Sequence, residues 1–408
     1  MTVGSLRKIA NQTGFQLAGK VLSSLVTLFS LSLITNHYGT EGTGVYTLVL
    51  TYISFFYLAA DLGLNAYALA LLNREEELFS KILGFRLLLA VLLVVIAIFL
   101  TFFIHDPSGM FFGAVLFGVV SIIGNAVFTS TNLIFQKHFR YDLSVTASSV
   151  TTLLSGVLLW IMVRYNYSVS ELLLVTTFCW LLCAFFGLVL VKRFLPLKVE
   201  LSYFFIRDTL IKIWPISTTL LLNVFYFRVD AFLLNYYRTL SEVGIYNFAY
   251  QFFQTALVLP TFIMNALYPL LLEKELNSPT ETKRYIIKSF SLMVGIGFVG
   301  SVVTYLVSPL LIPLVAYEGG FNVSVEILQV LGLSFPAFFG SAVLMWGLVT
   351  LRLNKTMFLI YLVGLLLNII LNNLFIPNYS YYGAAWVTVS CEYIILLLQI
   401  FFVMKYYS

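Results

Sequence analysis

Long apolar runs separated by short polar stretches recur along the whole chain. A helix needs about 20 predominantly apolar residues to cross a bilayer core of roughly 30 Å, and every run reaches that length. The pattern therefore predicts an all-α integral membrane protein with about twelve transmembrane helices. The predicted spans are 15–35, 45–72, 82–104, 110–135, 143–163, 171–191, 214–234, 245–272, 289–314, 325–351, 356–376 and 381–404.

The composition indicates the same class. Of the 408 residues, 60% are hydrophobic and 10% are charged, whereas a soluble domain has about 25% charged residues. The first apolar run exceeds the core of a signal peptide and shows no small-residue cleavage site, so we expect it to be retained. Cys179, Cys183 and Cys391 all lie inside apolar runs. No His or carboxylate cluster accompanies them, so we expect packing roles and no metal site.

The positions of Lys and Arg predict the orientation. Of these 23 residues, 18 fall at one set of helix ends and only Arg164 and Arg238 at the other. The remaining three, Lys20, Arg86 and Arg228, lie inside apolar runs. Cytoplasmic ends hold the excess of basic residues, so both termini are predicted to be cytoplasmic. The net charge of +5 is then explained by topology, and no nucleic-acid partner is expected.

The longest break between spans is the segment 192–212. It mixes charges with apolar residues such as Leu201, Tyr203 and Phe204, a pattern that suits an amphipathic helix lying in the cytoplasmic interface. It predicts an N-lobe of helices 1–6 at 1–191, an interfacial linker at 192–212 and a C-lobe of helices 7–12 at 213–408.

An internal repeat favours this division. The segment 36–46 contains Asn-His-Tyr-Gly-Thr and then Gly-Val-Tyr, and 235–246 contains Asn-Tyr-Tyr-Arg-Thr and then Gly-Ile-Tyr. Both follow the first predicted helix of their lobe. Six is an even number of helices, so each lobe begins on the same side and the repeats are parallel. A shorter echo, Asn-Tyr-Ser at 166–168 and 378–380, precedes the last helix of each lobe.

The segments around this repeat resemble the polysaccharide-transporter branch of the multidrug/oligosaccharidyl-lipid/polysaccharide exporter superfamily. The similarity is carried by 39–65 and by 225–269, where Arg-Val-Asp at 228–230 is followed by Gly-Ile-Tyr at 244–246. The resemblance implies two six-helix lobes in a V shape around a central cavity. It also implies transport of an undecaprenyl-pyrophosphate-linked oligosaccharide, such as an O-antigen or related surface polysaccharide unit.

Three basic residues within spans are candidates for binding the substrate, because an intramembrane charge costs about 2.5–3.5 kcal/mol on insertion scales. Arg228 suits pyrophosphate, which a guanidinium binds bidentately. The alternative for Arg228 is a structural ion pair with Asp61 or Asp230, or a side chain that snorkels to the lipid headgroups. Lys20 lies where family members place cavity-lining basic residues, although snorkelling explains it nearly as well. Arg86 is close enough to the cytoplasmic end of its helix for snorkelling.

Three carboxylates within spans are candidates for coupling transport to H⁺ or Na⁺: Asp61, Asp230 and Glu392. A buried carboxylate is adapted to proton exchange because burial disfavours its charged form. The structural alternative for each is a salt bridge.

Three asparagines complete the candidate substrate site. Asn223 shares a helix face with Asp230, and Asn368 and Asn372 lie one turn apart in the eleventh span. They suit hydrogen bonds with sugar hydroxyls or with a neighbouring helix.

Taken together, these features predict a flippase that works by alternating access in the bacterial cytoplasmic membrane. The expected partners are membrane lipids, the lipid-linked oligosaccharide, a polysaccharide polymerase and a chain-length regulator, and no cofactor is expected beyond a coupling H⁺ or Na⁺. One alternative is an ion-coupled multidrug antiporter of the same superfamily. A peptidoglycan-precursor flippase would resemble this fold with two further helices. A membrane polymerase or ligase is disfavoured because the outer loops are short and no Asp-x-Asp motif occurs, so the protein is not expected to be an enzyme.

Overall fold

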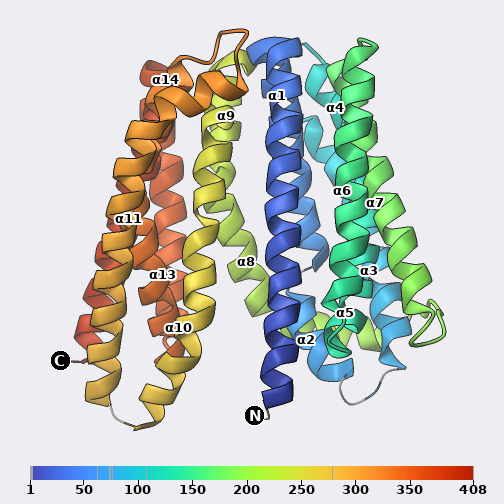
Figure 1. Ribbon diagram of the computed structural model, residues 1–408, viewed down its shortest axis with the longest axis vertical. Coiled ribbons are helices and arrows are strands. Elements are labelled where there is room, and N and C mark those ends of the chain that lie inside the picture. Colours follow the sequence, from blue (N-terminus) through green and yellow to red (C-terminus); the bar gives the residue numbers. More distant parts are fainter. Residues whose placement is uncertain are drawn as a thin grey trace. The chain divides into compact units, whose positions relative to one another are not determined.

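The computed structural model describes the backbone of residues 3–61, 63–72, 75, 77–106, 108–277 and 279–407. It describes their side chains except at 3–13, 66, 70, 215, 216, 219, 220, 223, 265, 266, 269, 270, 272–277, 279 and 354. Every regular element within these ranges is an α-helix, as predicted (Figure 1). Helices suit a bilayer because they satisfy their own backbone hydrogen bonds without water.

The first eight helical elements extend to Tyr237. They are α1 (Val3–Asp61), α2 (Leu64–Leu72), α3 (Leu78–Thr101), α4 (Met110–Gly118), α5 (Ser121–Lys137), α6 (Tyr141–Arg164), α7 (Val169–Val191) and α8 (Tyr203–Tyr237). The other six are α9 (Leu240–Ala256), α10 (Val258–Asn277), α11 (Pro279–Val315), α12 (Val323–Gly332), α13 (Phe335–Thr350) and α14 (Asn354–Tyr406).

Two of these elements each contain two spans. The path of α1 turns at Gly39, which has φ 63° and ψ −161°, and that of α14 turns at Ser380, which has φ 51° and ψ −135°. Among the described residues, eight continuous helical stretches are long and apolar enough to cross a membrane. Splitting two of them at these turns and adding α8 and the pair α9–α10 gives the twelve spans predicted from the sequence.

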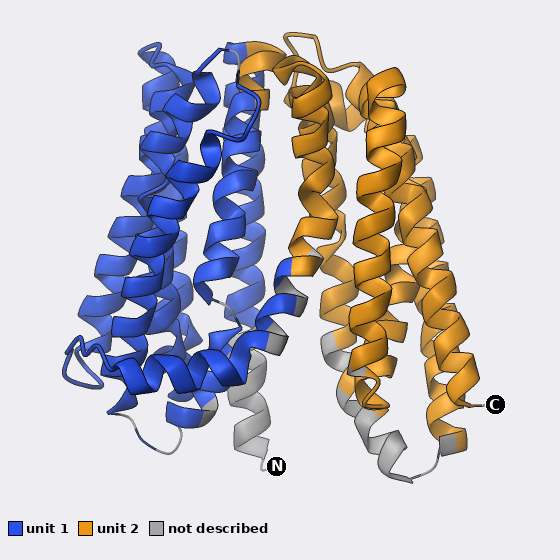
Figure 2. Ribbon diagram, turned by 180° about the vertical axis from the view of Figure 1, so that it is seen from behind, with its two compact units in different colours: residues 1–38, 45–221 blue, residues 39–44, 222–408 orange. Residues whose placement is uncertain are grey.

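The chain divides into two compact units (Figure 2). Unit 1 contains residues 1–38 and 45–221, and unit 2 contains 39–44 and 222–408. The boundary at 221–222 falls inside α8, and the predicted linker 192–212 lies wholly in unit 1. From Tyr203 onward this segment is continuous with the seventh span.

Each unit has its own apolar core. Phe79, Phe85 and Phe135 belong to a buried cluster in unit 1, and Leu344 and Ile395 belong to one in unit 2. Lipid is as apolar as leucine, so close packing rather than exclusion of water holds such helices together. Large apolar side chains accordingly stay exposed along the spans, as at Val95 and Leu310, which are 62% and 73% exposed.

The two copies of the sequence repeat meet within unit 2. A Cβ atom on Gly44 would lie 1.9 Å from the carbonyl oxygen of Leu240, and one on Gly244 would lie 1.9 Å from that of Thr40. The segment 39–44, which precedes the predicted second span, therefore packs on α9 backbone against backbone at the repeated glycine. This contact explains why these six residues belong to unit 2.

Candidate functional site

Arg86 is the centre of a polar cluster in unit 1. Its side chain is fully buried on α3, and its Nη2 donates to Asp61 Oδ1 at 2.5 Å and to Asn65 Oδ1 at 2.7 Å. Nη1 is 3.4 Å from Ser130 Oγ on α5. Asp61 ends α1 and Asn65 lies in the first turn of α2, so the break between these helices aims both acceptors at the guanidinium. Two sequence candidates, Arg86 and Asp61, thus form an ion pair with each other.

Lys20 lies on the first arm of α1, where its side chain is exposed. Gly19 beside it packs closely on α6, since a Cβ there would lie 2.6 Å from Val145 Cγ1. The arm is therefore attached to α6 along one side, while Lys20 points away from the packed interior of unit 1.

Arg228 is held by uncharged partners in unit 2. Its guanidinium carbon lies 4.5 Å from the ring centroid of Tyr250, and Nη2 donates to Gln254 Oε1 at 2.8 Å. Both partners lie on α9, one turn apart. Among the described side chains no carboxylate oxygen lies within 4.0 Å of this guanidinium, although Asp230 contributes electrostatically. A cation–π contact and one neutral acceptor position the charge and leave donors for an anion.

Asp230 is buried, with 2% of its surface exposed. The hydroxyl of Tyr246 on α9 donates to Asp230 Oδ2, and the hydroxyl of Thr388 on α14 lies 3.5 Å from the same oxygen. The backbone N–H of Ala231 donates to Oδ1 at 2.7 Å. Neutral donors from three helices thus surround this carboxylate.

Glu392 has a similar environment. It is 3% exposed, and it accepts a hydrogen bond from the hydroxyl of Tyr226. Tyr226 lies one turn before Asp230 on α8, and Thr388 lies one turn before Glu392 on α14. Each helix therefore presents a carboxylate and a hydroxyl on one face, and the hydroxyl of each helix lies against the carboxylate of the other. No ion pair to either carboxylate occurs within 4.0 Å among the side chains that the structure describes.

The asparagines of the eleventh span are also buried. Asn372 Nδ2 donates to Asn368 Oδ1 at 2.7 Å, and Asn372 Oδ1 has no hydrogen-bond partner. A buried acceptor without a donor is costly unless a ligand or water satisfies it. The Asn223 side chain lies outside the described residues.

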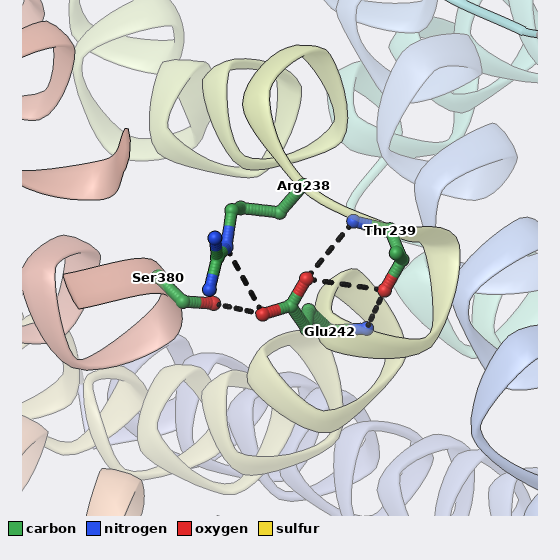
Figure 3. A network of polar contacts seen from close by, with 4 residues as sticks. All are labelled: Arg238, Thr239, Glu242 and Ser380. Atoms are coloured by element: carbon green, nitrogen blue, oxygen red, sulfur yellow. Dashed lines mark hydrogen bonds and ion pairs between the residues drawn. The ribbon is translucent and has the colours of Figure 1, made fainter. Parts of the chain in front are cut away.

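A second polar network lies where α8 is followed by α9 (Figure 3). Glu242 Oε2 accepts the N–H of Thr239 at 3.0 Å in a capping box, and its Oε1 accepts from Ser380 Oγ at 2.7 Å and Arg238 Nε at 3.1 Å. Burial alone would raise the pKa of Glu242, but the hydrogen bonds from Ser380 and Thr239 and the charge of Arg238 outweigh it, so the pKa is lowered.

Sequence reasoning missed several of these partners. Tyr246, Tyr250, Gln254 and Thr388 carry no charge, and most of the candidates were chosen as charged residues inside the spans. The one available signal was spacing, because Thr388 lies one turn from Glu392 as Tyr226 does from Asp230. Among the described residues no three His, Cys, Asp or Glu side chains are grouped as metal ligands would be.

Two family models match the chain. The model of the polysaccharide biosynthesis protein family matches residues 9–275, and the MatE model matches residues 215–374. The comparison with curated proteins finds no match.

Solved structures share the fold at low sequence identity. The lipid II flippase MurJ, in an inward closed conformation, is 15% identical with a TM-score of 0.77, over 97% of this chain and 87% of that one. An inward-facing multidrug resistance MATE family transporter is 14% identical with a TM-score of 0.75, over 94% of each chain. The Vibrio cholerae MATE transporter VcmN is 14% identical with a TM-score of 0.63, over 98% of this chain and 96% of that one.

The first family model spans well over half of the sequence, and the helical fold is that of membrane transporters. The chain is therefore a multi-pass membrane transporter that belongs to the polysaccharide biosynthesis protein family, within the multidrug/oligosaccharidyl-lipid/polysaccharide exporter superfamily.

Proposed function

We propose that this transporter is a flippase for an undecaprenyl-pyrophosphate-linked oligosaccharide, an O-antigen or related surface polysaccharide unit. The headgroup passes through the protein by alternating access while the polyprenyl chain stays in lipid. Membership of the polysaccharide biosynthesis family supports a glycan substrate. The likeness to a lipid II flippase supports a lipid-linked one.

The observation that carries the proposal is the setting of Arg228. A guanidinium inside a membrane span normally needs a carboxylate, yet this one is held by the ring of Tyr250 and the amide of Gln254. A pyrophosphate supplies the missing negative charge and accepts two parallel N–H bonds. Arg86 contrasts with it, because Asp61 already neutralises that guanidinium, and we assign the Arg86–Asp61 pair a structural role.

The other sequence candidates keep their proposed roles within their own units. Lys20, in unit 1, is exposed and suits contact with a phosphate. In unit 2 the unsatisfied Oδ1 of Asn372 beside Asn368 suits a sugar hydroxyl. Asn223 keeps the role predicted from its place on the Asp230 face of α8.

The two buried carboxylates of unit 2 are the preferred site for coupling transport to an H⁺ or Na⁺ gradient. Asp230 and Glu392 are buried and bonded to hydroxyl groups, so each is able to exchange a proton or bind Na⁺. Asp61 is less suited to ion coupling because it already forms an ion pair with Arg86.

We further infer that the protein resides in the bacterial cytoplasmic membrane with both termini in the cytoplasm. In this orientation a polysaccharide polymerase and a chain-length regulator would receive the product on the outer side. Transport itself requires no bond to be made or broken, so the proposal assigns no enzymatic activity.

A reconstituted assay tests the proposal. Purified protein in liposomes is given a polyprenyl-pyrophosphate disaccharide on one side, and an impermeant periodate probe reports headgroups that reach the other side. Arg228→Ala is expected to reduce the rate more than tenfold, since one charge-assisted bidentate contact accounts for that factor, and Arg228→Lys should recover part of it. The matched control is Arg207→Ala, an exposed arginine on the same helix.

Two outcomes would overturn the proposal. One is disaccharide transport at the wild-type rate in Arg228→Ala. The other is wild-type protein that moves no disaccharide but exports a cationic dye along an H⁺ or Na⁺ gradient, which would identify a multidrug antiporter. That second candidate is favoured by the MatE match at residues 215–374 and by the buried carboxylates, which suit cations.

A further inference from the structure

A groove of about 570 Å³ lies between the two arms of α14, within unit 2. Residues at helical spacing line it from both arms, on either side of the turn at Ser380. Gly383 lets the arms approach, because a Cβ there would lie 2.9 Å from the backbone of Phe375. The lining residues are Leu371, Phe375, Tyr379, Tyr382, Gly383, Trp386, Val387 and Ser390.

The depth of the groove indicates what fills it. It extends from the turn at Ser380 to Leu371 on one arm and to Ser390 on the other, which is roughly 14–15 Å at 1.5 Å per residue. Phe375 and Trp386 are 44% and 50% exposed along this length. Tyr and Trp side chains that belong to an interfacial belt would lie level with the turn at Ser380. Trp386 lies about 9 Å further along the helix, away from that level. The groove is therefore open and apolar at the depth of the lipid hydrocarbon, where it is accessible to the hydrocarbon chain of a lipid.

The rim at the turn carries charges of both signs. Ser380, at the mouth of the groove, donates to the same Glu242 oxygen that accepts from Arg238 Nε (Figure 3). Tyr382, which lines the groove, donates to Glu326 Oε2. Arg238 is 35% exposed at its side chain and Glu326 is exposed. Among the described residues, one cation and two carboxylates are thus linked by hydrogen bonds to Ser380 and Tyr382 at this end of the groove.

This charge pattern discriminates between lipid headgroups. An anionic headgroup would face two carboxylates against a single guanidinium. A zwitterionic headgroup with a phosphate and a primary ammonium places its phosphate at Arg238 and its ammonium at Glu326. A quaternary ammonium has no N–H to donate to that carboxylate.

We propose that the groove between the arms of α14 binds one hydrocarbon chain of a phosphatidylethanolamine-type lipid. Arg238 binds the phosphate of this lipid and Glu326 binds its ammonium group. This proposal does not depend on the identity of the transported substrate.

Native mass spectrometry of the full-length protein in detergent tests the site. The protein is mixed with equal amounts of phosphatidylethanolamine, phosphatidylglycerol and phosphatidylcholine of matched chains, and retained lipid is counted. Wild type is expected to retain phosphatidylethanolamine about tenfold over the other two, the discrimination that one charge-assisted hydrogen bond provides. Glu326→Gln should remove this preference, and the matched control Glu77→Gln, at an exposed carboxylate of unit 1, should keep it.

A variant that fills the groove tests binding of the lipid's hydrocarbon chain separately from binding of its headgroup. Ser390→Trp is expected to lower retention of all three lipids, with an unchanged melting temperature as the check on folding. If that variant does not purify, Trp386→Ala removes a wall of the groove and carries the same expectation. Equal retention of the three lipids by wild type, a preference for either of the others, or wild-type retention by the groove variant overturns the proposal.

Discussion

Five of the six ionisable side chains predicted within the spans are stabilised by one of three kinds of partner. Arg86 bonds to a carboxylate, Asp230 and Glu392 accept from hydroxyl groups, and Arg228 lies against an aromatic ring. Each arrangement offsets part of the cost of placing a charge in lipid. Only the last two leave the charge without a bonded counter-ion, which is why they are the stronger functional candidates.

Breaking the pair in unit 1 should destabilise the protein. Asp61→Asn leaves the fully buried guanidinium of Arg86 uncompensated. We expect a loss of about 3 kcal/mol in unfolding free energy, at the lower end for buried pairs because Asp61 is 23% exposed. Denaturant unfolding in detergent measures it.

The double variant and a surface pair serve as controls. Asp61→Asn with Arg86→Gln removes both charges and should recover most of the loss. Arg140→Gln breaks the exposed pair with Asp142 and should change stability by less than about 1 kcal/mol. A single Asp61→Asn variant as stable as wild type would contradict a structural role for the pair.

The lowered pKa of Glu242 predicts a pH-dependent contribution to stability. A carboxyl group whose folded pKa is below its unfolded value stabilises the protein fully above the unfolded pKa, and this contribution is lost as pH falls through the folded value. The melting temperature of wild type should therefore exceed that of Glu242→Gln above about pH 6 and approach it below about pH 4. A difference that is constant with pH, or that grows on acidification, would rule out this assignment.

At the scale of elements, the repeated glycines set how closely the segment 39–44 packs on α9 within unit 2. This packing needs a residue without a side chain on both helices, since the backbones of Gly44 and Gly244 are nearly in contact. Small residues play this part in membrane helix packing generally. The repeat in the sequence thus corresponds to a contact between its own two copies.

Gly244→Ala should disrupt this packing. The added methyl group would meet the Thr40 carbonyl and the Gly44 N–H, both backbone groups that cannot rotate away. We expect a loss of about 2–3 kcal/mol, at the upper end for overpacking. Gly295→Ala in α11 is the matched control, because a Cβ there has no neighbour within 4 Å, and it should be neutral or stabilising by about 0.5–1 kcal/mol. Similar effects at both positions would refute the close packing.

At the scale of the whole molecule, the distribution of Lys and Arg predicts orientation in the membrane. A fluorescent protein fused after Tyr407 should fold in the cytoplasm and fluoresce, and alkaline phosphatase fused there should be inactive. Fusions truncated at Asn166, between the fifth and sixth spans, should show the opposite pattern. An active phosphatase at the C-terminus would reverse the predicted topology.

The fold of the whole molecule does not select the substrate. Its similarity to a lipid II flippase and to a multidrug transporter is nearly equal, with TM-scores of 0.77 and 0.75. One fold serves different substrates when a few side chains change. Transport measurements on the Arg228 variants proposed above are therefore needed to identify the substrate.

The sequence by itself determined the membrane class, the twelve spans and the family, because hydropathy is a local property and the family residues lie in two short segments. It also identified six ionisable residues well inside the spans. Only the tertiary structure decided which charges are satisfied. Tyr226 and Glu392 are 166 residues apart, and Asp61 and Arg86 are 25 apart on different helices. Contacts between helices depend on helix rotation and packing, which hydropathy does not specify.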